Sequence, residues 1–316
     1  MRGAIAPGWT PDSAAEFADL MTPLSNWGRW GPDDELGTVN LLSSAHAAEA
    51  AAAVSSGRCV GLGRALSVLA AADNPLPLLH LMKSSGESAA SIGGSHASEW
   101  FGLAYHGFAV THLDAHSHQF FDGRMYNGRP AELVSTRTGA GAGSVGPLAR
   151  GLVGRGVLLD APRVMGRGWL EPGEGLEPSD LDAIATAQDT ELRAADLLIV
   201  RCGRDTRAAV HGVVDPMSVG SPGLSATCLP WLREHDVAVL GSDVQNDVMQ
   251  PGADAHPMPV HAGALVYLGL PLLDNLHLEE LAEACDRRGR WDFQLVVAPL
   301  ALPRFTGSPV NPIAIL

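Results

Sequence analysis

The stretch Leu197-Leu-Ile-Val200-Arg201 decides the fold class of this chain. A short apolar run of this kind is typical of a strand that is buried on both faces of a sheet. Residues 178–188 before it and 228–235 after it have the composition of helices. A second apolar run follows at residues 237–240, so helices and strands alternate as in an α/β protein.

Outward from this stretch, the same alternation extends over most of the chain. We expect further strands at residues 59–68, 156–160, 271–273 and 293–300, helices at residues 45–54, 260–269 and 274–285, and a Gly/Ser-rich loop at residues 86–98. The sequence has no internal repeat and no long charged linker. It therefore predicts one α/β domain, residues 46–316, preceded by an N-terminal arm, residues 1–45.

The composition is that of a folded, acidic protein. Hydrophobic residues make up 46% of the 316 residues, charged residues make up 18%, and the formal net charge is −14. Such a surface would repel nucleic acid and anionic membranes, so we expect a small-molecule substrate. The sequence has no signal-peptide pattern and no apolar run of about 18 residues, which indicates a soluble protein of the cytoplasm. The four cysteines are widely separated, which indicates reduced thiols.

The segment Thr111-His-Leu-Asp-Ala-His-Ser-His118 concentrates groups that bind metals. In an extended strand alternate side chains point to one face, so His112, Asp114, His116 and His118 would lie together. Imidazole nitrogens and a carboxylate suit a divalent cation such as zinc, manganese or iron. An exposed polar face of a strand is the alternative interpretation of the same spacing.

Residues 111–115 together with His118 resemble the T-H-x-D-A-x-x-H motif of the cyclase family that includes bacterial kynurenine formamidase and isatin hydrolase. The resemblance to its longer, actinobacterial-type members extends to residues 26–40, 125–128, 197–201, 240–243, 259–261 and 274–276. It implies a central mixed β-sheet or barrel-like core flanked by helices. It also implies a homodimer or higher homo-oligomer and a divalent metal ion, Zn²⁺ or Mn²⁺.

The resemblance assigns roles to particular residues. His112 and Asp114 match metal ligands of the family, and His261 matches a later histidine ligand. His118 matches a histidine that acts as a ligand or as an acid–base group. Asp274 lies near the position of a glutamate ligand in the formamidases, although both the residue type and the register differ.

One position departs from the formamidase pattern H-x-x-x-H-x-D. Phe108 stands where that pattern has its first histidine, so a site for two metal ions would lack a ligand. His116, which would share the face of His112, is one replacement, and His106, at a position of the same parity, is a weaker one. A site for a single metal ion, and a His116 that only contacts the substrate, are equally compatible with the sequence.

Four further residues are candidates for contact with the substrate: Phe108, Trp27, Arg201 and Asn246. An arginine at the end of a strand can bind a substrate carboxylate, but pairing of Arg201 with an aspartate such as Asp160 is the alternative. Asn246 lies in a polar run after a strand, where α/β proteins place binding groups, although such a run is also a plain loop. Packing in the core is the alternative for Trp27.

The sequence favours a metal-dependent hydrolase that cleaves an amide, lactam, lactone or ester with metal-activated water. It contains no G-x-S-x-G motif, which argues against a serine hydrolase. A cyclase of natural-product synthesis that uses the same metal site is one alternative. A relative that binds a metal or metabolite without catalysis is another, because Phe108 removes a ligand.

Overall fold

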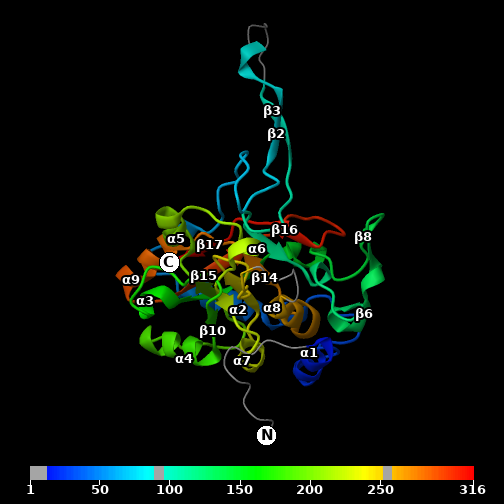
Figure 1. The fold of residues 1–316 in the computed structure, drawn as a ribbon, viewed down its shortest axis with the longest axis vertical. Coiled ribbons are helices and arrows are strands. Elements are labelled where there is room, and N and C mark those ends of the chain that lie inside the picture. The colour runs from blue at the N-terminus through cyan, green and yellow to red at the C-terminus, as the bar shows by residue number, and fades with distance from the viewer. Residues whose placement is uncertain (1–12, 89–95, 252–257) are drawn as a thin grey trace.

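A nine-stranded mixed sheet forms the centre of the protein (Figure 1), in a computed structural model that describes residues 13–88, 96–251 and 258–316. In order across the sheet the strands are β1 (Cys59–Gly61), β17 (Ile313–Ile315), β15 (Asp292–Val297), β9 (Leu152–Asp160), β11 (Leu197–Arg201), β13 (Val239–Ser242), β14 (Leu272–Asp274), β4 (His112–Asp114) and β16 (Gly307–Pro309). The four strands β9, β11, β13 and β14 are parallel, and the outer strands pair antiparallel. The predicted mixed α/β fold is confirmed.

Helices cover the sheet. The α-helices are α1 (Ala14–Met21), α2 (Ser44–Ala52), α3 (Ala161–Val164), α4 (Pro178–Ala187), α5 (Arg204–His211), α6 (Pro216–Val219), α7 (Cys228–Glu234), α8 (Pro259–His261) and α9 (Glu279–Arg288), and a π-helix, η8 (Ala262–Leu268), continues from α8. Short 3₁₀ helices are η1 (Thr22–Leu24), η2 (Gly37–Leu41), η3 (Gly86–Ser88), η4 (His116–His118), η5 (Tyr126–Gly128), η6 (Ala131–Leu133) and η7 (Gly146–Arg150). None of the helices in these described ranges has the length and apolar content to cross a membrane.

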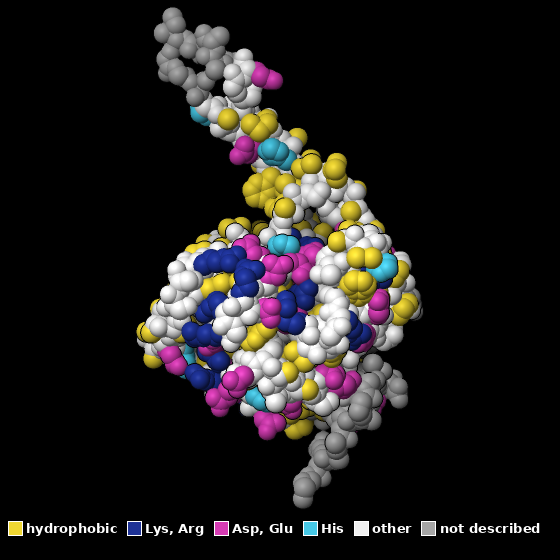
Figure 2. Space-filling view, turned by 90° about the vertical axis from the view of Figure 1, so that its left-hand side faces the viewer, with side chains coloured by type: hydrophobic (Ala, Val, Ile, Leu, Met, Phe, Trp, Pro, Cys, Tyr) yellow, Lys and Arg dark blue, Asp and Glu magenta, His cyan; other side chains and the backbone are white. Residues whose placement is uncertain are grey.

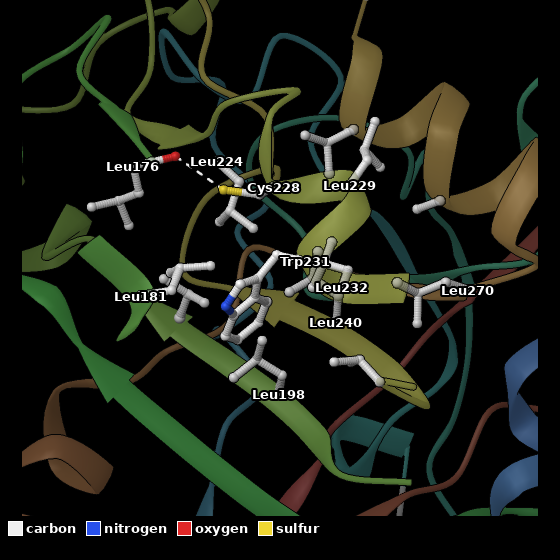
Figure 3. Close-up of a cluster of buried hydrophobic side chains, with 14 of the residues drawn as sticks. Leu176, Leu181, Leu198, Leu224, Cys228, Leu229, Trp231, Leu232, Leu240 and Leu270 are labelled. Carbon is white, nitrogen blue, oxygen red and sulfur yellow. Dashed lines mark hydrogen bonds between the residues drawn. The ribbon is translucent and has the colours of Figure 1, made fainter. Parts of the chain in front are cut away.

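The sheet is buried on both faces because apolar side chains alternate between two cores. On β11, Leu198 and Val200 belong to one core, whereas Leu197 and Ile199 belong to the other. In the first core, Trp231 of α7 packs together with leucines of α4, β11 and β13 (Figure 3). Each fully buried side chain of this size stabilises the fold by about 1.5–3 kcal/mol relative to its exposed state.

Four predicted elements differ from the structure. The strand expected at residues 59–68 ends at Gly61, because only residues 59–61 pair with β17. The strand expected around Thr111–His118 is extended only from His112 to Asp114, because only these residues pair with β14 and β16, and a 3₁₀ helix follows at His116. The helix expected from residue 274 begins at Glu279, because Asn275 has a left-handed backbone, with φ of 58°. The helix expected at residues 260–269 is mostly π-helical.

A hairpin of β2 (Leu79–Ser84) and β3 (Ser98–Gly102) projects from the body as a long arm (Figure 1). Part of the loop expected at residues 86–98 lies outside the described residues, and Ser98 already belongs to β3. Three smaller two-stranded sheets complete the fold: β5 (Arg124–Met125) with β6 (Arg129–Pro130), β7 (Val134–Ser135) with β8 (Gly139–Ala140), and β10 (Gly175–Leu176) with β12 (Gly223–Leu224).

Candidate metal centre

Strand pairing brings three candidate ligands together. His112 on β4 lies directly opposite Asp274 on β14, and Asp114 lies two residues further along β4 on the same face. The Nε2 atom of His112 is 3.4 Å from Oδ1 of Asp114 and 3.9 Å from Oδ2 of Asp274. The His112 Nδ1 atom lies 2.8 Å from the carbonyl oxygen of Val110. Nδ1–H therefore donates to that carbonyl, which leaves the lone pair of Nε2 directed at the carboxylates.

His261, the last residue of α8, adds a second imidazole. Its Nε2 atom is 3.6 Å from Oδ2 of Asp114 and 3.4 Å from Oδ2 of Asp274. Its Nδ1 atom is 2.6 Å from Oδ2 of Asp247, which also accepts hydrogen bonds from the backbone N–H groups of Val260 and His261 through its two oxygens. Asp247 thus fixes the ring so that Nε2 faces the other carboxylates.

His106 is the third imidazole of this cluster. It follows β3 in the chain, and its Nδ1 atom lies 2.8 Å from Oδ1 of Asp114. Its Nε2 atom is 3.0 Å from the hydroxyl of Thr306. The structure therefore brings His106, and not His116, next to the ligands that the motif predicts.

The buried carboxylate of Asp114 is the feature that best matches a cation. Asp114 is fully buried, and the imidazole nitrogens of His106, His112, His118 and His261 lie within 4 Å of its two oxygens. Burying a carboxylate is costly unless positive charge lies next to it, and these imidazoles supply that charge only when they carry a proton or hold a cation. Asp114 is common to two groups of three close ligand atoms, one with His106 and His112 and one with His261 and Asp274. Nitrogen and carboxylate donors in this combination fit zinc, manganese or iron.

The close contacts between carboxylates and imidazoles shift the pKa values of Asp114 and His261 in opposite directions. Burial alone would raise the pKa of Asp114, but the imidazoles of His118 and His112 outweigh it and hold this pKa well below its usual range. Burial alone would lower the pKa of His261, but the carboxylates of Asp274, Asp114 and Asp247 raise it well above the usual range. The carboxylates in this cluster attract positive charge, whether it is a proton or a metal ion.

His118 is, like His106, a partly exposed imidazole of the cluster. Its Nε2 atom is 3.8 Å from Oδ2 of Asp114, and its ring stacks on the ring of His106 with centroids 3.9 Å apart. Burial lowers the pKa of His118 to about 4, although the Asp114 charge opposes this shift. At neutral pH the ring is therefore uncharged.

The other predicted residues lie elsewhere or play supporting roles. The His116 ring packs against Tyr126, with centroids 4.8 Å apart, and belongs to neither ligand group. The Trp27 indole donates a hydrogen bond of 2.6 Å to the carbonyl of Val266 and stacks on Tyr267, so it serves in packing. Phe108 is half-buried in the loop before β4.

Arg201 pairs with Asp160, as the alternative to substrate binding predicted. Its guanidinium lies 2.8 Å from Asp160 and 2.6 Å from Glu279, in ion pairs that are largely buried. Asn246, by contrast, lies beside the candidate ligands. Its Nδ2 atom donates to Oδ1 of Asp274 over 2.6 Å, while its own Oδ1 is buried without a partner in the described part of the chain.

The sequence placed Asp247 in the same polar run as Asn246 but gave it no particular role in the site. The only signal was its place in the polar run that follows β13, and a run of this kind is also common in ordinary loops. The role of the Asp247 carboxylate is visible only in the folded structure, where His261 of α8 lies against it.

Comparison with known proteins agrees with this fold. The sequence profile of a family described as "Putative cyclase" matches residues 44–246, more than half of the chain, and the chain therefore belongs to this family. The predicted family is thus confirmed. A kynurenine formamidase of Bacillus cereus is 26% identical over 145 residues, which cover 45% of this chain and 61% of that protein. The match thus spans less than two thirds of the curated relative.

Solved structures are similar over a larger part of the chain than the sequence relative. The structure of "a novel cyclase" superposes with a TM-score of 0.83 at 28% identity and covers 92% of this chain and 99% of that one. An isatin hydrolase bound to the product analogue thioisatinate superposes with a TM-score of 0.60 at 20% identity and covers 87% and 99% of the two chains. At that identity the isatin hydrolase shows a shared fold.

Proposed function

We propose that this protein is a metal-dependent hydrolase that cleaves an amide, lactam, lactone or ester bond of a small molecule. The observation that carries the proposal is the fully buried Asp114 carboxylate, whose oxygens lie within 4 Å of the imidazole nitrogens of His106, His112, His118 and His261. Relatives named kynurenine formamidase and isatin hydrolase support the choice of hydrolysis. The four free cysteines agree with action in the cytoplasm.

In this proposal His112, Asp114, His261 and Asp274 hold the metal ion, Zn²⁺ or Mn²⁺, and His106 takes the place of the donor missing at Phe108. A divalent ion in such a site lowers the pKa of a bound water toward ~7 and polarises a carbonyl group. His118 is neutral at that pH and exposes about a quarter of its side chain. With a metal bound, His118 would be the group that takes a proton from the attacking water at Nε2 and returns it to the leaving group.

The proposal is tested by metal analysis together with a substrate panel. Protein purified without chelator is analysed for metal per chain and assayed on an N-formyl aromatic amine, isatin, a lactone and an ester. We expect bound zinc or manganese and hydrolysis of at least one compound, with both lost in Asp114→Asn. Parent protein that binds neither metal with micromolar affinity or better and cleaves none of the four classes would overturn the proposal.

A cyclase activity is the second candidate, because the matching family and the structural neighbour with the TM-score of 0.83 both carry that name. The same site would then polarise a ketone for ring closure within a linear precursor. Metal would bind as before, but the four hydrolysis substrates would stay intact. Loss of water from a linear polyketone, dependent on Asp114, would favour this second candidate.

A further inference from the structure

A pocket lies at the carboxyl ends of β11 and β13, the edge of the sheet at which α/β proteins commonly bind ligands. One side of the pocket is formed by α5, which begins at Arg204 soon after β11 ends. Another side is formed by Val244 and Gln245, which come soon after β13. Among the described residues, none of the imidazoles and carboxylates of the candidate metal centre lines this pocket. It is therefore a separate candidate for ligand binding.

The walls of the pocket are mostly apolar. Six apolar side chains contribute to them: Leu170, Pro172, Val213, Val214, Pro222 and Val244. Small-molecule sites have this character, with a few polar groups that fix the ligand. The pocket offers about 60 Å³ to the centres of water-sized molecules, and one water needs about 10–15 Å³ by the same measure. A ligand of roughly four to six non-hydrogen atoms is therefore of the right size.

Three arginines supply charged groups. Arg64, Arg204 and Arg207 line the pocket, and Asp73 is the one carboxylate among the described residues that do so. The chain has 35 acidic and 21 basic residues, so three arginines around one pocket depart from its acidic composition. Figure 2 faces the side of the body that carries α5 and shows Lys and Arg side chains gathered there. The pocket therefore favours a negatively charged ligand.

Arg207 is the arginine best placed to bind such a ligand. Its Nε atom lies 3.3 Å from an oxygen of Glu171, whose side chain is 59% exposed. Ion pairs as exposed as this one contribute little. Within the described ranges, the two terminal nitrogens of Arg207 make no hydrogen bond. A carboxylate can therefore accept hydrogen bonds from both nitrogens, in the bidentate geometry that guanidinium groups favour.

Arg64 and Arg204 add positive charge that their partners do not fully offset. Arg64 forms an ion pair with Asp205, and Arg204 lies 2.6 Å from Asp73. Burial, and after it the charge of Arg64, lower the pKa of Arg204, although both carboxylates oppose this shift. An anion in the pocket would offset the repulsion between the two guanidinium groups.

We propose that this pocket is a second ligand site, which binds a small carboxylate with a short apolar chain. The carboxylate pairs with Arg207 in the field of Arg64 and Arg204, and the chain lies against the apolar wall. An inorganic anion would leave that wall exposed to water, whereas a neutral molecule would leave the charge of the arginines without a partner. The site goes beyond the proposed hydrolysis, because no candidate metal ligand takes part in it.

The pocket and the metal centre are connected by hydrogen bonds. Arg204 donates to Oδ1 of Asn275 over 2.7 Å, and Nδ2 of Asn275 donates to the carbonyl of Val110. The same carbonyl accepts the Nδ1–H of His112. A carboxylate can also bind directly to a metal ion, so binding to the pocket has to be measured both with and without a chelator.

The experiment titrates the full chain with butyrate, a carboxylate of the required size, and follows binding by saturation-transfer NMR. Butyramide, which has a similar shape without the charge, is the comparison ligand. We expect a millimolar or lower Kd for butyrate and the same Kd with chelator. The Kd for butyramide should be at least ~5-fold higher, because hydrogen bonds between charged groups are stronger than neutral ones. This comparison does not depend on a variant.

Two variants test the charge and the space of the pocket separately. Arg207→Gln removes the guanidinium and should raise the Kd for butyrate at least ~5-fold. Ala208→Trp, on the side of α5 that lines the pocket, fills the space without a change of charge and should abolish binding. Arg193→Gln is the matched control, because Arg193 is 54% exposed, pairs with Glu49 and precedes β11 at the other end of that strand. This control should bind butyrate like the parent.

The proposal fails if the parent does not bind butyrate at concentrations up to ~50 mM, or if it binds butyramide equally well. A parent-like affinity in either pocket variant would also refute it. Loss of butyrate binding on adding chelator would refute it in favour of binding at the metal centre. Because the readout is binding and not turnover, failure here leaves the proposed hydrolase activity untouched.

Discussion

Asp247 and Asp243 lie close together in the chain, are both fully buried, and support different parts of the structure. Asp247 accepts the ring Nδ1–H of His261 and so directs the other ring nitrogen toward Asp114. Asp243 accepts three backbone N–H groups, of Cys202, Gly203 and Arg204, at the start of α5. A substitution of Asp247 should therefore affect both metal binding and stability, whereas the same substitution of Asp243 should affect stability alone.

We expect Asp247→Asn to weaken metal binding by about 10- to 100-fold, because an amide facing three N–H donors no longer fixes the imidazole. The measurement is titration calorimetry with Zn²⁺ or Mn²⁺ on metal-free protein. Asp243→Asn is the control and should lower the melting temperature while leaving the metal affinity within about twofold. Equal loss of affinity in both variants would show that Asp247 acts only through general stability.

A second pair of variants decides which histidine replaces the donor missing at Phe108. His106→Ala should reduce metal affinity by at least ~10-fold, because Nδ1 of His106 is 2.8 Å from the Asp114 carboxylate. His116→Ala should keep the affinity and lower stability, because this ring is buried against Tyr126. The opposite pattern of affinities would restore His116 as the ligand.

The sequence predicted the candidate ligands to different extents. His112 and Asp114 stand out because a short motif places them two residues apart, and a strand turns that spacing into a shared face. The same reasoning favoured His116, but it assumed an extended chain beyond Asp114, where the backbone instead enters a 3₁₀ helix. His106 comes from a loop, and no periodicity in the sequence indicates where a loop side chain lies.

At the scale of elements, η2 is held against the end of η8 by a close backbone approach. The Thr38 N–H donates to the carbonyl of Gly269 over 2.8 Å. Gly37 has a φ of 57°, and an added Cβ would overlap the same carbonyl. A glycine is required here both for its left-handed conformation and for the lack of a side chain.

We therefore expect Gly37→Ala to lower the free energy of unfolding by about 3 kcal/mol or more, through strain and overlap combined. Gly57→Ala is the matched control. Gly57 also has a positive φ, of 70°, but nothing lies within 4 Å of an added Cβ, so only ~1 kcal/mol of strain is expected. Urea denaturation measures the free energy of unfolding of both variants and of the parent. Equal losses would mean that the contact between η2 and η8 contributes little.

Elements that carry buried apolar runs were predicted best, because burial on both faces of a parallel sheet leaves a continuous signal in the sequence. This holds for β9, β11 and β13. The hairpin of β2 and β3 was missed. Its apolar residues are exposed on an arm outside both cores, and no local pattern shows what covers such a surface.

At the scale of the whole molecule, the metal site and the arm share one segment of chain. β3 ends at Gly102, and the loop that follows contains Tyr105, whose hydroxyl donates to the carbonyl of Gly307, and then His106. The candidate ligands thus come from that loop, from β4, from α8 and from β14. A metal ion held by all of them would join segments that are distant in the sequence.

Metal binding should therefore stabilise the whole domain. A ligand that binds only the folded state adds about 2.7 kcal/mol at a concentration of 100 times its Kd, which for a chain of this size raises the melting temperature by roughly 4 °C. We expect this rise on adding Zn²⁺ or Mn²⁺ to metal-free protein, and its reversal by a chelator, in thermal scans. Asp114→Asn should abolish the response. A parent that melts at the same temperature with saturating metal and with chelator would mean that these segments are held together by protein contacts alone.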